Sequence, residues 1–526
     1  MGLGLIATTI GLGLLGWLQW SRQASARGRP AAASRVERGD QARARRDEQL
    51  ARARSLLDQA DHAGAAAALD RALEANPGDA EALALQVRAF RALRQYPAAR
   101  SAALRILERF PQSPLAHILL GSIALQQGDA ASARRGLEQA IELDTSSALA
   151  LAQLAELDLM AGLAAEARTR AERALSLEPG NTTALRVLSR VSRSVPELLS
   201  VYGRLLEASS GDELARSWLE VLRSGRTHRV NEVADLKAEV AIPWEVDRDG
   251  RVFVRAEISG MRGLRLLVDT GASGLVLSEG LARRLGHPLR EFAESAGVGG
   301  TRSHAHPIVV ERIALGGVRA RNLMATASVL PAGMSGILNP LALAPAGSGV
   351  RVELRPSRRA LVFSPEGAPA AAPSERWVTV PFLADGHHII FRVVLAGRPA
   401  MALLDSGAAV DLVDRSMLAR LPPATLRAPL EPGEALVGFG GRVDDAEVVA
   451  DVGLRVAGRD FTTRRLFVMD LNVEPFRFQV DLDAVVGIAR LSAFDLRIDP
   501  GRGLLAFKPL EYPSPGTTGP IARRAR

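Results

Sequence analysis

The feature that most constrains this chain is a short motif, Asp-Thr/Ser-Gly-Ala, which occurs twice and begins at Asp269 and at Asp405. Each copy lies between two apolar runs, which is typical of a turn between buried strands. Burying a single carboxylate among such strands is unfavourable unless the carboxylate has a partner. The second copy of the motif supplies a partner, and we therefore expect the two aspartates to lie together.

The residues around the two motifs repeat in the same order. In each copy, strands precede the motif, and a short helix, a glycine-rich segment, a later glycine and two closing strands follow it. The later glycines are Gly336, after Met334 and Ser335, and Gly487, after two valines. The repetition predicts an internal duplication. Its parts are a first unit over residues 238–365, a Pro/Ala-rich linker over 366–375 and a second unit over 376–511.

The order of motif, glycine-rich segment and later glycine resembles the retropepsin-like aspartic protease family, over about half of the chain. The resemblance implies an all-β, two-lobed acid protease of the retropepsin and pepsin kind, with Asp269 and Asp405 as the catalytic residues. It assigns support of this dyad to Thr270, Gly271, Ser406 and Gly407. It assigns mobile, substrate-binding flaps to Val298, Gly299, Gly300, Phe439, Gly440 and Gly441.

Two carboxylates side by side suit the hydrolysis of an amide without a metal or a cofactor. Because two like charges at close range cannot both ionise easily, the pair holds one proton. The ionised carboxylate can then act as a general base on water, while the protonated one donates to the substrate carbonyl oxygen. Since both copies occur in one chain, we expect the catalytic unit to be an intrachain pseudo-dimer.

A second repeat precedes these units. Ala65, Ala99, Ala133 and Ala167 recur at an interval of about 34 residues, with two amphipathic helical patterns in each interval. This pattern resembles the tetratricopeptide (TPR) repeat and predicts an all-α solenoid. The predicted repeats cover residues 46–79, 80–113, 114–147 and 148–181, and capping helices extend to residue 225. The concave face of such a solenoid binds peptides or partner proteins.

The two regions together allow two functional hypotheses. The first is a bacterial aspartic endopeptidase acting on polypeptides, with a TPR module that recruits the substrate or a protein partner. The alternative is a scaffold protein that acts through its TPR repeats, with a protease-like pair that binds peptides but is catalytically idle.

The N-terminal residues 1–21 are apolar, and they are followed by a linker over 22–45. An uncharged run of this length is sufficient to cross a bilayer as a helix. Two interpretations remain open: a transmembrane anchor, or a signal segment with a small-residue cleavage site at Ala24-Ser25-Ala26. The expected location is therefore membrane-associated or periplasmic, with the side of the membrane left open. The C-terminal residues 512–526 are expected to be a disordered tail.

Composition excludes some chemistry. The chain contains no cysteine, so thiol catalysis, disulfides and Cys-ligated metals are excluded. The formal net charge is +8. No basic and aromatic motif accompanies this charge, so we do not expect nucleic-acid binding. Most of the basic residues are arginines, which is typical of a GC-rich bacterial genome.

Overall fold

The computed structural model describes residues 33–248, 250–289, 294–296, 302–366, 376–421, 430–433, 436–438, 441–443, 446–463, 465–472 and 478–510. The chain divides into two compact units. The described residues of the first unit are helical and lie within 1–157, 167–188 and 207–211, and the second unit, over 158–166, 189–206 and 212–526, contains the described strands together with helical segments. Each unit is described by itself.

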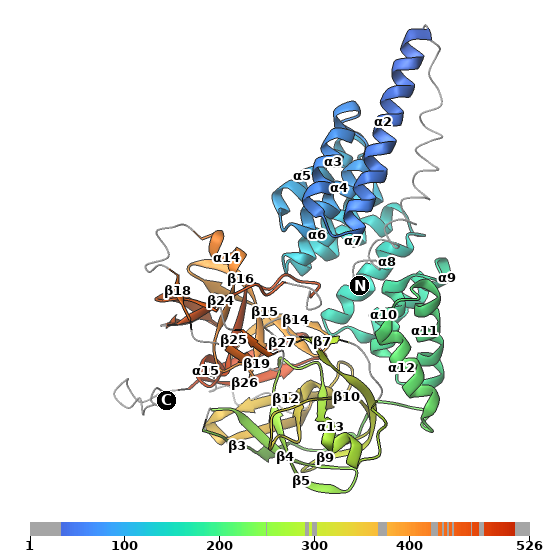
Figure 1. Ribbon diagram of the computed structural model, residues 1–526. Helices are drawn as coiled ribbons and strands as arrows, with labels where there is room; N and C mark the ends of the chain where they lie inside the picture. The colour runs from blue at the N-terminus through green and yellow to red at the C-terminus, as the bar shows by residue number, and fades with distance from the viewer. Residues whose placement is uncertain are drawn as a thin grey trace. The chain divides into compact units, whose positions relative to one another are not determined.

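Helical hairpins form the N-terminal half of the described chain (Figure 1). The helices are α2 (Ala33–Asp58), α3 (His62–Ala75), α4 (Ala80–Ala92), α5 (Tyr96–Arg109), α6 (Pro114–Gln126), α7 (Ala130–Leu143), α8 (Ala148–Met160), α9 (Ala164–Leu177), α10 (Thr182–Val191), α11 (Val195–Ala208) and α12 (Glu213–Ser224). Helices α4, α6 and α8 begin at the first residues of the second, third and fourth predicted repeats. The predicted helical repeat fold is therefore confirmed.

The alanines that mark the repeat explain why the helices pack closely. Ala65, Ala99, Ala133 and Ala167 lie in α3, α5, α7 and α9 and are fully buried. A side chain of one carbon lets the backbones of neighbouring helices approach closely. Side-chain caps begin several of the helices, because the first N–H groups of a helix have no partner within it. Asp129, for example, accepts a hydrogen bond from the backbone N–H of Ser132.

The strands lie in two lobes. The first lobe contains β2 (Val240–Pro243), β3 (Glu245–Val246), β4 (Val252–Ile258), β5 (Met261–Val268), β6 (Leu275–Ser278), α13 (Glu279–Arg284), β7 (Glu294–Ala296), β8 (Arg302–His304), β9 (His306–Leu315), β10 (Val318–Ser328), β11 (Gly336–Leu338), η1 (Pro340–Leu343), β12 (Val350–Arg355), η2 (Pro356–Arg358) and β13 (Ala360–Pro365), and β1 (Glu232–Val233) pairs with β10.

The second lobe repeats this order. It contains β14 (Val378–Asp385), β15 (His388–Leu395), β16 (Arg398–Asp405), β17 (Leu412–Asp414), α14 (Arg415–Ala419), β18 (Glu431–Pro432), β19 (Leu436–Gly438), β20 (Gly441–Val443), β21 (Glu447–Val449), β22 (Val452–Val456), β23 (Arg459–Thr463), β24 (Leu466–Met469), β25 (Ala484–Gly487), α15 (Ile488–Leu491), β26 (Phe494–Asp499) and β27 (Leu504–Pro509).

Each lobe surrounds its motif with the same three-strand arrangement. In the first lobe, β11 lies between β5 and β6, parallel to β5 and antiparallel to β6. In the second lobe, β25 lies between β16 and β17 with the same two directions. The motif is the connection between the outer two strands of each trio. The duplication inferred from the sequence is thus present in the topology.

The register of these trios corrects one alignment made from the sequence. Leu338 pairs with Val268, while Val486 pairs with Leu404, so the residues behind the two aspartates are Asn339 and Gly487. Gly336 pairs with Leu266 and is therefore not the counterpart of Gly487. The sequence alignment matched Gly336 to Gly487 because both are glycines. In the second lobe, however, two aliphatic residues precede the glycine, whereas in the first lobe the aliphatic residues Ile337 and Leu338 follow Gly336.

A shared sheet joins the two lobes. Strand β12 pairs with β13 of its own lobe and with β26 of the second lobe, which in turn pairs with β27 (Figure 1). Apolar residues of both lobes form one buried cluster that includes Phe363, Phe391 and Phe507. Glu353 is buried at the junction, where Arg497 donates to it at 2.7 Å and Arg355 pairs with it as well. Pairing of this kind is needed because an isolated buried charge is unfavourable.

The predictions of a membrane anchor and of a membrane-associated location are contradicted by the helices that the structure describes. In the described part of the chain, no helix is both long enough and apolar enough to cross a bilayer. Helix α2 is the longest of the helices given above, and it is strongly polar. Residues 1–21 and the tail at 512–526 lie outside the described residues.

Candidate active site

The two motif aspartates occupy equivalent strand ends. Asp269 directly follows β5, and Asp405 is the last residue of β16. The backbone N–H of Asp269 donates to Leu338 in β11, and Asp405 pairs with Gly487 in β25. Two turns therefore leave matching trios and meet where the lobes face each other.

Reciprocal hydrogen bonds link these turns. The Thr270 hydroxyl donates to the carbonyl of Leu404 at 2.8 Å and accepts from the N–H of Ser406 at 2.9 Å. The Ser406 hydroxyl donates to Val268 at 3.0 Å and accepts from the N–H of Thr270 at 3.0 Å. Both hydroxyl residues are buried, so water cannot reach them. The four bonds therefore supply the hydrogen-bond partners that these buried polar groups need.

The carboxylate of each aspartate lies against the glycine of the opposite motif. A Cβ atom on Gly271 would lie 2.5 Å from the carboxyl carbon of Asp405. A Cβ atom on Gly407 would lie 2.3 Å from the carboxyl carbon of Asp269. No side chain fits at such separations, so the close approach of the two carboxylates requires glycine at both positions.

The site raises the pKa of both carboxyl groups. Burial is the main cause for Asp269, and the charge of Asp405 and a hydrogen bond with Asp405 raise the pKa of Asp269 further. Burial also raises the pKa of Asp405, but the hydrogen bond from Asp269 and the N–H groups of Ala408 and Gly407 favour its ionised form. Two carboxyl groups this close cannot both ionise easily, so they titrate together as a pair.

The sequence did not identify Asn339 as part of this site. Asn339 is fully buried behind the first motif, and its side-chain amide donates to Thr270 and to Ala272 at 3.0 and 2.8 Å. A signal was available, because aligning Ile337-Leu338 with the two valines of β25 places Asn339 opposite Gly487.

A turn of the second lobe also reaches the first motif. His387 lies between β14 and β15, and its Nδ1 is 2.7 Å from the carbonyl oxygen of Ser273. Burial lowers the pKa of His387 to about 4. The next residue, His388, stacks edge-on against Phe478, and its charge favours the ionised form of Asp405.

The predicted flap residues lie, in chain order, beside short paired strands of each lobe. Strand β7 pairs with β8 and strand β19 with β20, each as a separate two-stranded sheet. Gly441 pairs with Gly438 at the closed end of the second hairpin. Val298, Gly299, Gly300, Phe439 and Gly440 lie outside the described residues.

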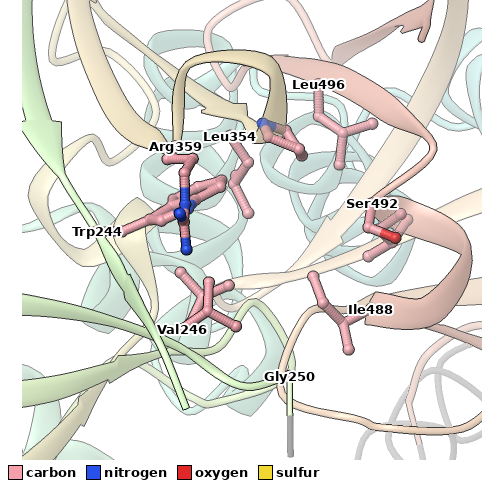
Figure 2. A pocket seen from close by; sticks show the side chains of 11 residues that line it. Trp244, Val246, Gly250, Leu354, Arg359, Ile488, Ser492 and Leu496 are labelled. Atoms are coloured by element: carbon pink, nitrogen blue, oxygen red, sulfur yellow. The ribbon is translucent and has the colours of Figure 1, made fainter. Parts of the chain in front are cut away.

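The second lobe and the first both contribute to an apolar cavity, and neither Asp269 nor Asp405 lines it. Its volume is about 180 Å³. Figure 2 shows Trp244 and Arg359 on one side of it and Ile488 and Ser492 on the other. It contains no pair of carboxylates, so it is not the site that the motifs form.

Comparison with known proteins gives matches for both regions. No curated protein matches the chain in sequence. A solved structure of TTC0263, a thermophilic TPR protein of Thermus thermophilus, has 21% identity and a TM-score of 0.30, covering 34% of this chain and 98% of its own. A solved aspartic proteinase from Irpex lacteus has 13% identity and a TM-score of 0.35, covering 53% of this chain and 99% of its own.

Models of two protein families match defined segments of the sequence. A tetratricopeptide repeat model matches residues 50–114 and 84–148. An aspartyl protease model matches residues 254–339, which include Asp269 and end at Asn339. The chain therefore contains tetratricopeptide repeats followed by an aspartyl protease domain.

Proposed function

We propose that this chain is an aspartic endopeptidase in which Asp269 and Asp405 activate one water molecule for peptide hydrolysis. The observation that carries the proposal is the contact of each carboxylate with the glycine of the opposite motif. The four hydrogen bonds of Thr270 and Ser406 support it, because they hold the two turns rigidly together. Such preorganisation is what a catalytic dyad needs.

The environments of the two carboxyl groups suggest different roles. Asp405 accepts hydrogen bonds from Gly407 and Ala408, at 2.9 and 3.0 Å, which favours its ionised form and the role of general base. Asp269 would carry the proton and donate it to the carbonyl oxygen of the substrate. Water loses a proton to Asp405 as it attacks the carbonyl carbon. The tetrahedral intermediate then returns a hydroxyl proton to Asp269 and expels the amine, which takes the proton held by Asp405.

The proposed catalytic unit is a pseudo-dimer within one chain. Both motifs come from the same polypeptide, and β12 and β26 join the two lobes edge to edge. A second chain is therefore not needed to complete the pair. The hairpins β7–β8 and β19–β20 would close over an extended polypeptide and exclude water during the reaction.

The helical repeats supply the second half of the proposal. We infer that they recruit the polypeptide substrate or a protein partner, which is the use that a TPR solenoid suits. Recruitment of this kind would raise the local concentration of substrate at the protease domain.

The test is a cleavage assay on the full chain from pH 3 to 7 with a peptide library, with and without a statine-type inhibitor. Asp269→Asn and Asp405→Asn should each abolish cleavage. Asp460→Asn is the matched control, because Asp460 is an exposed residue that pairs with Arg455, and it should leave cleavage unchanged. Cleavage that survives both motif substitutions would exclude the dyad, and a wild-type chain that binds peptides without cleaving them would favour an idle protease-like module.

A further inference from the structure

The two lobes differ at the residue directly behind each aspartate. The shared register makes Asn339 the counterpart of Gly487, and the next residues, Pro340 and Ile488, are counterparts as well. A second pair of backbone bonds agrees with this register. The N–H of Ser278 donates to the carbonyl of Ser335, and in the second lobe the N–H of Asp414 donates to the carbonyl of Asp483. The positions are thus equivalent in backbone, while their side chains are unrelated.

The second lobe offers only backbone donors at these positions, because neither Gly487 nor Ile488 has a polar side chain, and the N–H of Gly487 donates to the Asp411 carboxylate at 3.0 Å. A Cβ atom on Gly487 would lie 2.5 Å from the carbonyl oxygen of Val410, so only glycine fits there. The backbone N–H of Ile488 donates to the carbonyl of Ala408 at 2.8 Å. Ala408 belongs to the turn that begins with Asp405, and this bond therefore anchors the turn to β25 and α15.

The first lobe cannot make the same bond. Pro340 stands where Ile488 stands in the second lobe, and proline has no backbone N–H to donate. The counterpart of the Ala408 carbonyl is that of Ala272, in the turn of Asp269. This carbonyl accepts a hydrogen bond from the side-chain amide of Asn339 at 2.8 Å. A side-chain donor thus takes the place of the missing backbone donor.

The same amide reaches two further carbonyl oxygens. It lies 3.0 Å from the carbonyl of Thr270 and 3.0 Å from that of His387, which belongs to the second lobe. The side-chain oxygen of Asn339 accepts from the N–H of Leu341, so both ends of the amide are satisfied. Since Asn339 is fully buried, water cannot replace these bonds if the side chain is removed.

We propose that Asn339 is a positioning residue that holds the Asp269 turn in place of the N–H that Pro340 lacks, and that ties this turn to His387 of the second lobe. The relevance of this role to catalysis rests on the proposed peptidase function. The geometry of the turn does not depend on that function. The consequence is an asymmetry in one bond, because the Ala272 carbonyl accepts from a side chain, that of Asn339, whereas the Ala408 carbonyl accepts from a backbone N–H, that of Ile488.

The test compares three variants of the full chain. Asn339→Gly removes the amide and matches the residue of the second lobe. Asn339→Gly combined with Pro340→Ile also restores a backbone N–H at the position of Ile488. Asn181→Gly is the control for loss of a buried asparagine, because Asn181 is equally buried and lies at the N-terminus of α10. Hydrogen exchange of peptides covering residues 269–274 is measured together with kcat and KM.

Asn339→Gly should speed exchange in the 269–274 peptides about tenfold, the effect of losing one buried hydrogen bond. It should lower kcat about 10- to 100-fold with little change in KM, because the reacting carboxylate is displaced rather than the substrate contacts. The double variant should recover most of both effects, and Asn181→Gly should show neither. The pH profile of kcat should shift in the single variant and return in the double one.

Two results would overturn the inference: unchanged exchange in Asn339→Gly, or a double variant no better than the single one. The exchange measurement needs no activity. If the wild-type chain cleaves no peptide but exchange responds as expected, the proposed function fails and the positioning role stands. If the chain is active but exchange and kcat are unaffected by Asn339→Gly, the reverse holds.

Discussion

At the scale of single residues, the candidate site depends on short side chains that bond across the two lobes. Thr270 and Ser406 each donate to a carbonyl of the opposite lobe and accept an N–H from it. Thr270→Val should cost about 1–3 kcal/mol of unfolding free energy, because it leaves the Leu404 carbonyl and the Ser406 N–H without their buried partner. Chemical denaturation measures this cost. Thr270→Ser retains the hydroxyl that the second lobe uses and should stay close to wild type, whereas equal losses in both variants would contradict the cross-lobe role.

The raised pKa of Asp269 predicts how stability depends on pH. Below the ordinary carboxyl pKa, the folded and unfolded chains are both protonated at this residue. As the pH rises toward the folded-state pKa, the unfolded chain releases a proton that the folded chain retains, so stability falls. Asp269→Asn should therefore be more stable than wild type at pH 7 and gain less at pH 3.5, while kcat falls on the order of 10³- to 10⁴-fold. Unfolding curves at the two pH values decide the point, and an equal gain at both would contradict it.

His387 predicts the opposite pH dependence. Its pKa is lowered from 6.5 to about 4 by burial, so above pH 6.5 the ring is neutral in both states. Between pH 6.5 and 4 the unfolded chain takes up a proton that the folded chain does not, and the unfolding free energy falls with acidification. His387→Gln should reduce this fall. His228→Gln makes the same change at an exposed position, and its unfolding free energy should follow that of wild type across the range.

At the scale of elements, the motif turns tolerate no larger residue than glycine. Gly407→Ala would place a methyl group against the Asp269 carboxylate and force the two turns apart. We expect kcat to fall about 100-fold or more, since displacement of a reacting group by about 1 Å has such an effect. Gly453→Ala in β22 is the matched control, because a Cβ atom there meets nothing within 4 Å. Retained activity in Gly407→Ala would show that the carboxylates do not need this close approach.

The elements themselves could largely be predicted from sequence. The interval between Ala65, Ala99, Ala133 and Ala167 is a local signal, and the helices that it predicts are present. The repeated order of strand, motif and strand likewise predicted both lobes. The pairing of β11 was harder to predict, because it depends on contacts between residues far apart in the chain. Asn339 and Thr270, for example, are 69 residues apart. The local signal was ambiguous, because Gly336 offers the glycine of the pattern while Ile337 and Leu338 offer the two aliphatic residues that place Asn339 there.

At the scale of the whole molecule, a site built within one chain makes a prediction about mixtures. Chains carrying Asp269→Asn lack one member of the pair, and chains carrying Asp405→Asn lack the other. Because β12 and β26 join the lobes within each chain, a mixture of the two variants should remain inactive. The specific activity of the wild-type chain should also be constant on dilution. Recovery of cleavage in the mixture would show that the pair forms between chains.

The sequence by itself determined the local patterns of this protein: helical repeats, two copies of one β-rich unit, and an aspartate in each. These are properties of neighbouring residues, which fix the period of a helix or a strand. Only the tertiary structure decided that the two carboxylates lie against opposite glycines, that the Asn339 amide bonds to the Ala272 carbonyl, and that the His387 ring lies 2.7 Å from the carbonyl oxygen of Ser273. These depend on how the strands of the two lobes pair and pack, because burial and hydrogen-bond partners exist only once distant segments meet.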